Sequence, residues 1–185
     1  MLRKKTIMKR NLIYLALLTI GAISFDNAYS QKDDRPLIII IQPHICFPVG
    51  EIKKTNGVEL GGHLSIETML GTKSRLLFQF GGGLLQGKTD NDPSLPYPGD
   101  FPAITVMQLR AGGKYFLTDG LFLAGLAGGA QSFRQGDKSF GFSFAPVLGY
   151  EFGNVRLLDF SLRYDNSMFK NYNLRTIALS LGYHF

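Results

Sequence analysis

The residues Thr176–Phe185 (TIALSLGYHF) decide the fold of this chain. Large apolar or aromatic residues alternate here with small or polar ones. Successive side chains of a β-strand point to opposite faces, so this period of two predicts a strand with one apolar and one polar face. The apolar set is Ile177, Leu179, Leu181, Tyr183 and Phe185, and the other set is Thr176, Ala178, Ser180, Gly182 and His184.

The same alternation recurs through most of the preceding sequence. In one segment, Leu60 and Leu64 share a face while Glu59 and His63 share the other. Turn residues separate eight such segments, and no helical period competes in any of them. The segments 37–47 and 121–133 are apolar on both faces, which leaves their orientation open. The eight expected strands are 37–47, 58–70, 75–86, 103–117, 121–133, 140–152, 156–166 and 174–185.

Eight strands with an apolar face predict an all-β fold, an eight-stranded antiparallel transmembrane β-barrel in a bacterial outer membrane. Closure is expected because lipid offers no hydrogen-bond partner to an open sheet edge. A soluble barrel of the lipocalin kind is the main alternative, with large apolar residues inside and charges outside. The polar faces here are mostly Gly, Ser, Ala and Gln, which suit a narrow, filled interior better than a solvated surface.

The connections between the expected strands alternate in length. Those after the second, fourth and sixth strands are tight, at 71–74, 118–120 and 153–154. Those after odd-numbered strands are generally longer, and 87–102 is the longest. Outer-membrane barrels have short periplasmic turns and longer extracellular loops, so we expect the odd-numbered connections to face outward and both termini to be periplasmic.

The N-terminal residues have the pattern of a secretory signal peptide. Five basic residues lie within 1–10, an apolar stretch covers 12–25, and Ala28-Tyr29-Ser30 provides a small-x-small cleavage pattern. The apolar stretch is shorter than the roughly 20 residues that a transmembrane helix needs. We therefore expect a signal peptide at 1–30 and one outer-membrane β-barrel domain at 31–185.

Charge and cysteine content exclude several classes of function. Residues 1–30 carry a net charge of +4, so only +2 of the total +6 belongs to 31–185. This balance provides no concentrated basic face for nucleic acid. Cys46, the single cysteine, forms no internal disulfide, and we interpret it as a small residue of the barrel wall.

The polar faces predict a filled interior, because an eight-stranded barrel is just wide enough for its own side chains. Both charge signs occur there in similar number, so we expect an ion-pair and hydrogen-bond network and no diffusion pore. His44 and His63, with Glu59 nearby, are residue types that could in principle hold a metal ion. They have no compact ligand motif, so we expect network members and neither metal nor cofactor. The expected interior network is Glu59, His63, Glu67, Arg110, Lys114, Glu151, Asp159 and Arg163.

The signal peptide with Gln31 after the cut, the eight alternating segments and the Leu181–Phe185 end resemble small outer-membrane β-barrel proteins common in Bacteroidetes. These are grouped as outer-membrane beta-barrel domain or PorT-like proteins. The resemblance implies insertion by the barrel-assembly machinery, with Tyr183 and Phe185 in the recognition signal. Ser180 replaces a glycine that is usual in that signal. The resemblance also allows a role as a subunit of an envelope or secretion complex.

A lipid-modifying barrel enzyme is the alternative from another class. Small barrel lipid A deacylases carry a His-x-Ser pair near the top of a late strand. Asp165 stands here where that histidine would be, so Ser167 lacks a general base. We therefore expect no catalysis.

The connection 87–102 is the most distinctive surface. It holds four prolines, which stiffen a loop, together with Leu95 and Tyr97 as candidate partner contacts. The function we expect is a structural, scaffolding or partner-binding role, in contact with outer-membrane lipid and with an envelope protein as the possible partner.

Cleavage after Ser30 should leave Gln31 as the first residue of the purified protein, because the basic, apolar and small-x-small regions stand in the required order. Intact-mass spectrometry of the membrane-extracted protein measures this. A mass that includes residues 1–30 contradicts the assignment.

Overall fold

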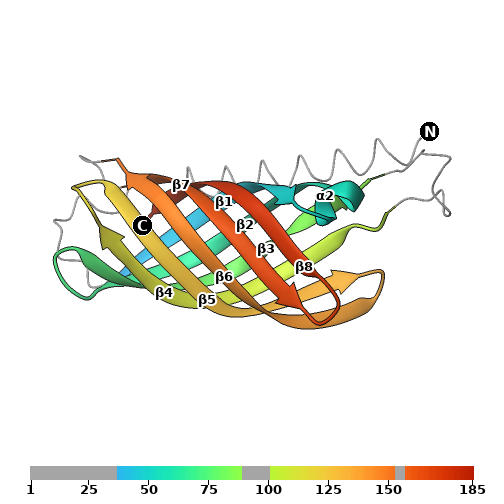
Figure 1. Ribbon diagram of the computed structural model, residues 1–185. Coiled ribbons are helices and arrows are strands. Elements are labelled where there is room, and N and C mark those ends of the chain that lie inside the picture. The colour runs from blue at the N-terminus through green and yellow to red at the C-terminus, as the bar shows by residue number, and fades with distance from the viewer. Residues whose placement is uncertain (1–36, 89–100, 153–156) are drawn as a thin grey trace. The chain divides into compact units, whose positions relative to one another are not determined.

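The structure is a computed structural model that describes residues 37–88, 101–152 and 157–185. The expected signal peptide and the candidate contacts Leu95 and Tyr97 lie outside these residues. The described residues form a closed barrel in which each strand pairs antiparallel with the next, and β8 pairs with β1 (Figure 1). The strands are β1 (Leu37–Val49), β2 (Asn56–Met69), β3 (Ser74–Gly87), β4 (Ile104–Phe116), β5 (Leu121–Arg134), β6 (Asp137–Glu151), β7 (Leu158–Phe169) and β8 (Asn173–His184).

The seam between β8 and β1 closes the barrel with the segment that opened the sequence analysis. Ile41 pairs with Tyr183, and Cys46 pairs with Ala178. At the end of the chain, the Phe185 N–H donates to the Ile39 carbonyl at 2.8 Å. The expected eight-stranded antiparallel barrel is therefore confirmed, with strand bounds close to those expected.

Burial in this barrel is the reverse of that in a soluble protein. Large apolar side chains cover the outside, as at Leu109 and Phe140, which are 65% and 73% exposed. Charged side chains such as Arg110 and Glu67 are 2% exposed and point inward. This arrangement excludes the soluble alternative, because in water the barrel would expose a broad apolar surface, which soluble monomeric proteins rarely do. The protein is a transmembrane barrel of the bacterial outer membrane.

The structure also decides the orientation of the two strands that were apolar on both faces. In β1, Ile40, His44 and Cys46 point inward. In β5, Phe122 and Leu126 do so.

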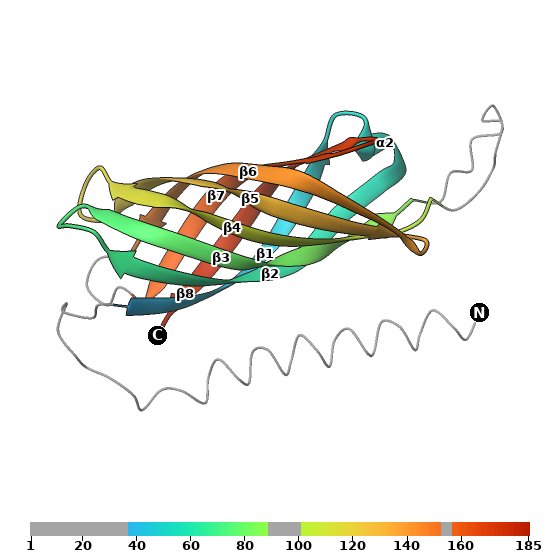
Figure 2. The ribbon, with the colours of Figure 1, turned by 90° about the horizontal axis from the view of Figure 1, so that it is seen from below.

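The two ends of the barrel differ in their connections (Figure 2). The terminal end holds Phe185 and the turns 70–73 and 117–120. The distal end holds the connections 50–55, 135–136 and 170–172, together with the end of β3 and the start of β4. A four-residue helix, α2 (Ile52–Thr55), lies in the first of these distal connections. No helix among the described residues is long and apolar enough to cross a membrane.

The expectation of longer distal connections is wrong after β5 and β7. Only Gln135 and Gly136 join β5 to β6, and both have positive φ, at 49° and 92°. Such a two-residue turn matches the twist of a hairpin. The polar residues Asp137 and Lys138, expected in a loop, extend the ladder by pairing with β5. Backbone pairing does not require apolar side chains, so the hydrophobic pattern ends before the strand does.

An apolar layer closes the barrel interior at the distal end. Ile52 of α2 and Tyr172 pack against it, and the Tyr172 hydroxyl donates to Ser132 Oγ at 2.7 Å. The polar interior therefore lies between this layer and the terminal end. The buried members of the layer are Leu85, Ile104, Val106, Ala130, Phe169 and Leu174.

Candidate functional site: the polar interior of the barrel

Four charged side chains form a cluster inside the terminal end, which we call the charge quartet: Glu67, Arg75, Lys114 and Glu151. Arg75 Nη1 lies 2.9 Å from Glu67 Oε2 and 2.8 Å from Glu151 Oε1. Lys114 Nζ lies 3.0 Å from Glu67 Oε1 and 2.5 Å from Glu151 Oε1. Each carboxylate thus contacts both cations, and the cluster has no net charge.

The quartet brings like charges together on neighbouring strands. Arg75 and Lys114 are direct cross-strand partners, a pairing that is unfavourable for two cations alone. The two carboxylates offset that repulsion. Phe122 adds a ring 4.1 Å from Lys114 Nζ, and Phe116 adds one 4.7 Å from Arg75 Cζ. Aromatic faces stabilise cations where water is excluded.

Asp165 is the centre of a second cluster, midway along the barrel. Arg163 Nε donates to Asp165 Oδ2 at 2.7 Å, and Arg110 Nη1 donates to Asp165 Oδ1. Arg110 Nη2 also donates to Gln79 Oε1 at 2.6 Å. Asp165 is missing from the interior network expected from the sequence, although it falls on the polar face of its segment. Its spacing of two from Arg163 places both on the inward face.

His63 joins this central cluster to β1. Its Nδ1 lies 3.0 Å from His44 Nδ1, and its Nε2 lies 3.2 Å from Gln108 Oε1. The two imidazole rings stack with centroids 4.6 Å apart. Arg110 Nη2 lies 3.2 Å from His63 Nε2 as well, so the histidines and the arginines form one connected group.

The neighbours of Ser167 do not provide a general base. Gln108 Nε2 donates to Ser167 Oγ at 3.1 Å, and Ser167 donates to Ser143 Oγ at 3.2 Å. His63 reaches the serine only through the Gln108 side chain. A serine nucleophile needs a base within hydrogen-bond reach, and Ser167 is instead buried in an amide and hydroxyl network.

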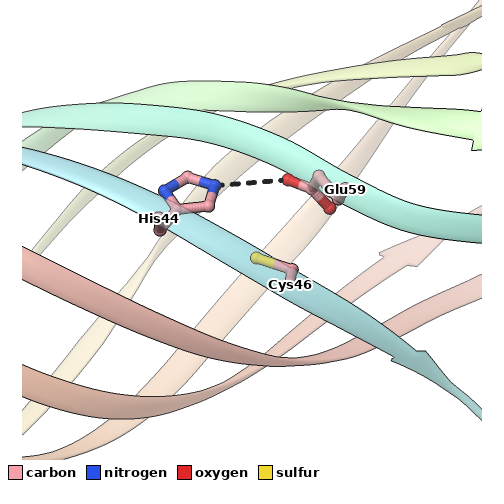
Figure 3. Close-up of side chains that lie close together, drawn as sticks. All are labelled: His44, Cys46 and Glu59. Atoms are coloured by element: carbon pink, nitrogen blue, oxygen red, sulfur yellow. Dashed lines mark ion pairs between the residues drawn. The ribbon is translucent and has the colours of Figure 1, made fainter.

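Of the two remaining expected network residues, Asp159 lies apart from both clusters, and Glu59 contacts the central group through His44. Asp159 and His184 form a buried pair at the terminal end, with His184 Nε2 2.6 Å from Asp159 Oδ2. Glu59 lies beside His44 and Cys46, nearer the distal end (Figure 3). All eight expected network residues are thus buried inside the barrel, in separate groups.

Tyr183 and Phe185, the expected assembly signal, lie on the outer side of β8, alternating with the buried His184. Their rings meet edge to face with centroids 4.8 Å apart.

A pocket of about 190 Å³ lies at the terminal end, where Arg75 and Glu151 of the quartet line it. Further inside, the barrel leaves little free space. A cavity among Gln42, Gln79 and Arg163 has a volume of about 20 Å³. This is room for one water molecule. With the apolar layer at the distal end, the interior has the character of a packed core.

No protein-family model and no curated protein matches this sequence. Solved structures show the fold. Ail, the attachment invasion locus protein of Yersinia pestis, in complex with the heparin analogue sucrose octasulfate, matches with a TM-score of 0.58 and 13% identity over 80% of this chain and 98% of that chain. Neisserial surface protein A matches with a TM-score of 0.55 and 11% identity over 81% and 96%.

The outer membrane protein OprG from Pseudomonas aeruginosa matches with a TM-score of 0.50 and 11% identity, over 81% of this chain and 96% of that chain. At these identities, the matches show a shared architecture. The architecture of this chain is that of the small eight-stranded barrels of bacterial outer membranes.

Removing one cation of the charge quartet should destabilise the barrel. Lys114→Met leaves Glu67 and Glu151 to share Arg75, and we expect the free energy of unfolding to fall by about 3–5 kcal/mol. The double variant Lys114→Met/Glu151→Gln should recover part of that loss, since it restores charge balance. Urea unfolding in detergent micelles, followed by heat-modifiable gel mobility, measures both.

The matched control is Lys54→Met. Lys54 forms an exposed ion pair with Glu51 at 2.8 Å, and such pairs contribute about 0–1 kcal/mol. Equal losses for Lys54→Met and Lys114→Met contradict the role assigned to the quartet.

Proposed function

We propose that this protein is a non-catalytic barrel with a structural or scaffolding role, which binds a partner at its distal end. One observation carries the proposal: the interior is filled by paired charges and capped by an apolar layer. An interior that is filled by side chains, with charges of both signs paired, supports neither solute diffusion nor selection of an ion. The chemistry available to other molecules is therefore on the ends of the barrel.

The distal end offers a surface suited to a partner. A groove of about 500 Å³ lies between α2 and the turn from β7 to β8. Ile52 and Tyr172 form an apolar part of the groove wall, and Lys54 and Arg175 line the groove with positive charge. β3 ends and β4 begins at this same end, and the candidate contacts Leu95 and Tyr97 fall between these two strands in the sequence.

The solved structures support contact with an external molecule by analogy alone. Ail is described as an attachment invasion locus protein, and one of its structures holds a heparin analogue. A barrel of this architecture therefore can present a binding surface. The PorT-like resemblance favours a narrower version of the proposal, in which the partner belongs to an envelope or secretion complex.

A lipid-modifying enzyme is the second candidate, and the surroundings of Ser167 argue against it. The serine points into the barrel, and its hydrogen-bond partners are Gln108 and Ser143. A deacylase nucleophile must reach lipid and must have a base beside it.

A photo-crosslinking residue at Lys54 should capture a protein partner in intact cells, because this side chain is 73% exposed at the distal end. The same residue placed at Asp119, in the exposed turn at the terminal end, is the matched control and should not give that adduct. Gel shift followed by mass spectrometry identifies the product.

Two outcomes contradict the proposal. A steady conductance of the wild type in planar bilayers means that the interior is not closed. Loss of an acyl chain from lipid A on expression of the wild type, but not of Ser167→Ala, establishes the enzyme instead.

We also propose that Tyr183 and Phe185 form part of the signal read by the barrel-assembly machinery. Phe185→Asp should lower the folded fraction severalfold at low expression, because it places a charge on the outer face of the closing strand. Asn173→Asp adds the same charge at an exposed position at the other end of β8 and should fold normally. Heat-modifiable mobility gives the folded fraction, and similar values for the two variants refute the assignment.

A further inference from the structure

We propose that His44, Cys46 and Glu59 form a Zn²⁺ site inside the barrel, where the three side chains converge (Figure 3). His44 and Cys46 are two residues apart on β1, so both point inward. Glu59 is the cross-strand partner of Cys46 on β2. This inference does not depend on the proposed function.

The donor atoms are spaced as metal ligands require. A ring nitrogen of His44, Sγ of Cys46 and a carboxylate oxygen of Glu59 all lie within 4.8 Å of one another. His44 Nε2 is 3.5 Å from Glu59 Oε1. Two ligands at the usual bond lengths of a tetrahedral zinc ion lie about 3.4 Å apart. The observed separation therefore leaves room for an ion between them.

The Nε2 atom of His44 is the observation that points most directly to a ligand. It is buried and has no hydrogen-bond partner, and the His44 side chain is 1% exposed. A buried polar atom without a partner costs about 1–3 kcal/mol. Coordination of a cation by Nε2 removes that cost.

The opposite nitrogen of the same ring is already held. His44 Nδ1 lies 3.0 Å from His63 Nδ1, and Gln108 holds the far side of the His63 ring. Metal-binding histidines are typically oriented in this way through the nitrogen that does not bind the ion. The contact aims Nε2 at Glu59 and Cys46.

Two inward-facing glycines provide the space around these donors. A Cβ atom at Gly61 would lie 2.6 Å from His44 Nε2. A Cβ at Gly83 would lie 2.7 Å from Cγ of Glu59. A side chain at Gly83 would have to displace Glu59, and one at Gly61 would clash with the β3 backbone as well as with His44. Gly61 and Gly83 are cross-strand partners, so the donors occupy room that two side chains would otherwise fill.

The donor set selects the class of metal. Nitrogen, sulfur and oxygen ligands together suit Zn²⁺, whereas Mg²⁺ and Ca²⁺ favour oxygen alone. On binding, the Cys46 thiol loses its proton to solvent and its sulfur forms the bond to the ion. The thiolate and the Glu59 carboxylate then balance the two positive charges, and water takes the fourth position.

The position on β1 gives the site a consequence for stability. β1 is the strand on which β8 closes, and Cys46 pairs with Ala178 at that seam. An ion that ties β1 to β2 stabilises the strand that β8 must meet. Binding to the folded state alone also raises stability by mass action.

The untagged protein, purified in detergent and freed of metal with a chelator, should bind one equivalent of Zn²⁺ in a calorimetric titration. Co²⁺ in place of Zn²⁺ should give the absorption of a thiolate-to-cobalt charge transfer and the visible bands of a tetrahedral ion. Cys46→Ala should abolish the charge-transfer absorption. It should also weaken Zn²⁺ binding by at least about 100-fold. Loss of an outer-shell partner already costs up to about 100-fold in affinity, and Cys46 would bind the ion directly. Glu59→Gln should weaken binding in the same direction.

The matched control is His184→Gln. His184 forms the other buried histidine–carboxylate pair, with Asp159, and has no cysteine beside it, so the variant should keep full Zn²⁺ affinity. The proposal is overturned if the folded wild type binds no Zn²⁺, or if Cys46→Ala binds it as tightly as the wild type. It is also overturned if His184→Gln loses as much affinity as Cys46→Ala. Should Cys46→Ala not fold, the cobalt spectrum of the wild type decides.

Discussion

The structure depends on one constraint: the hydrocarbon of a bilayer offers no hydrogen-bond partner to the peptide backbone. A sheet can span it only if every edge is paired, and the pairing of β8 with β1 completes the ring. Closure separates an outer face in contact with lipid from an inner face enclosed by the strands. The reversed burial follows, with Leu109 exposed and Arg110 enclosed on adjacent positions of β4.

The same enclosure determines what the polar residues can do. A buried charge is costly unless an opposite charge and further hydrogen bonds accompany it. In the charge quartet each charge contacts two opposite charges, and Asp165 is held by two arginines, so most interior charges are already paired. The proposed function is therefore assigned to the ends of the barrel, where the distal groove lies. Several buried interior atoms have no hydrogen-bond partner, among them Arg110 Nε and His44 Nε2, and at His44 the further ligand types Cys46 and Glu59 lie beside that atom.

Sequence reasoning was most successful where a pattern reports a local property. The period of two along Thr176–Phe185 follows from strand geometry and correctly separated inward from outward residues. It was least successful where partners come from distant strands. Asp165 was considered beside Ser167, its neighbour in sequence, whereas its contacts are with Arg163 and with Arg110 of β4. Likewise, the sequence suggests His44 and His63 with Glu59 as the set to compare with a metal site, whereas the structure brings Cys46 to His44 and Glu59.

Alternation and turn residues within short segments suffice to predict the number of strands, their antiparallel order and, in the segments that alternate cleanly, which side chains face lipid. The sequence leaves open the orientation of β1 and β5, which are apolar on both faces. It did not determine where β6 begins, since a hairpin ladder continues through polar residues such as Asp137 without a hydrophobic signal. Which interior groups meet depends on the three-dimensional arrangement of the strands. Barrel closure and strand stagger set those distances across the interior, and no spacing along the chain encodes them.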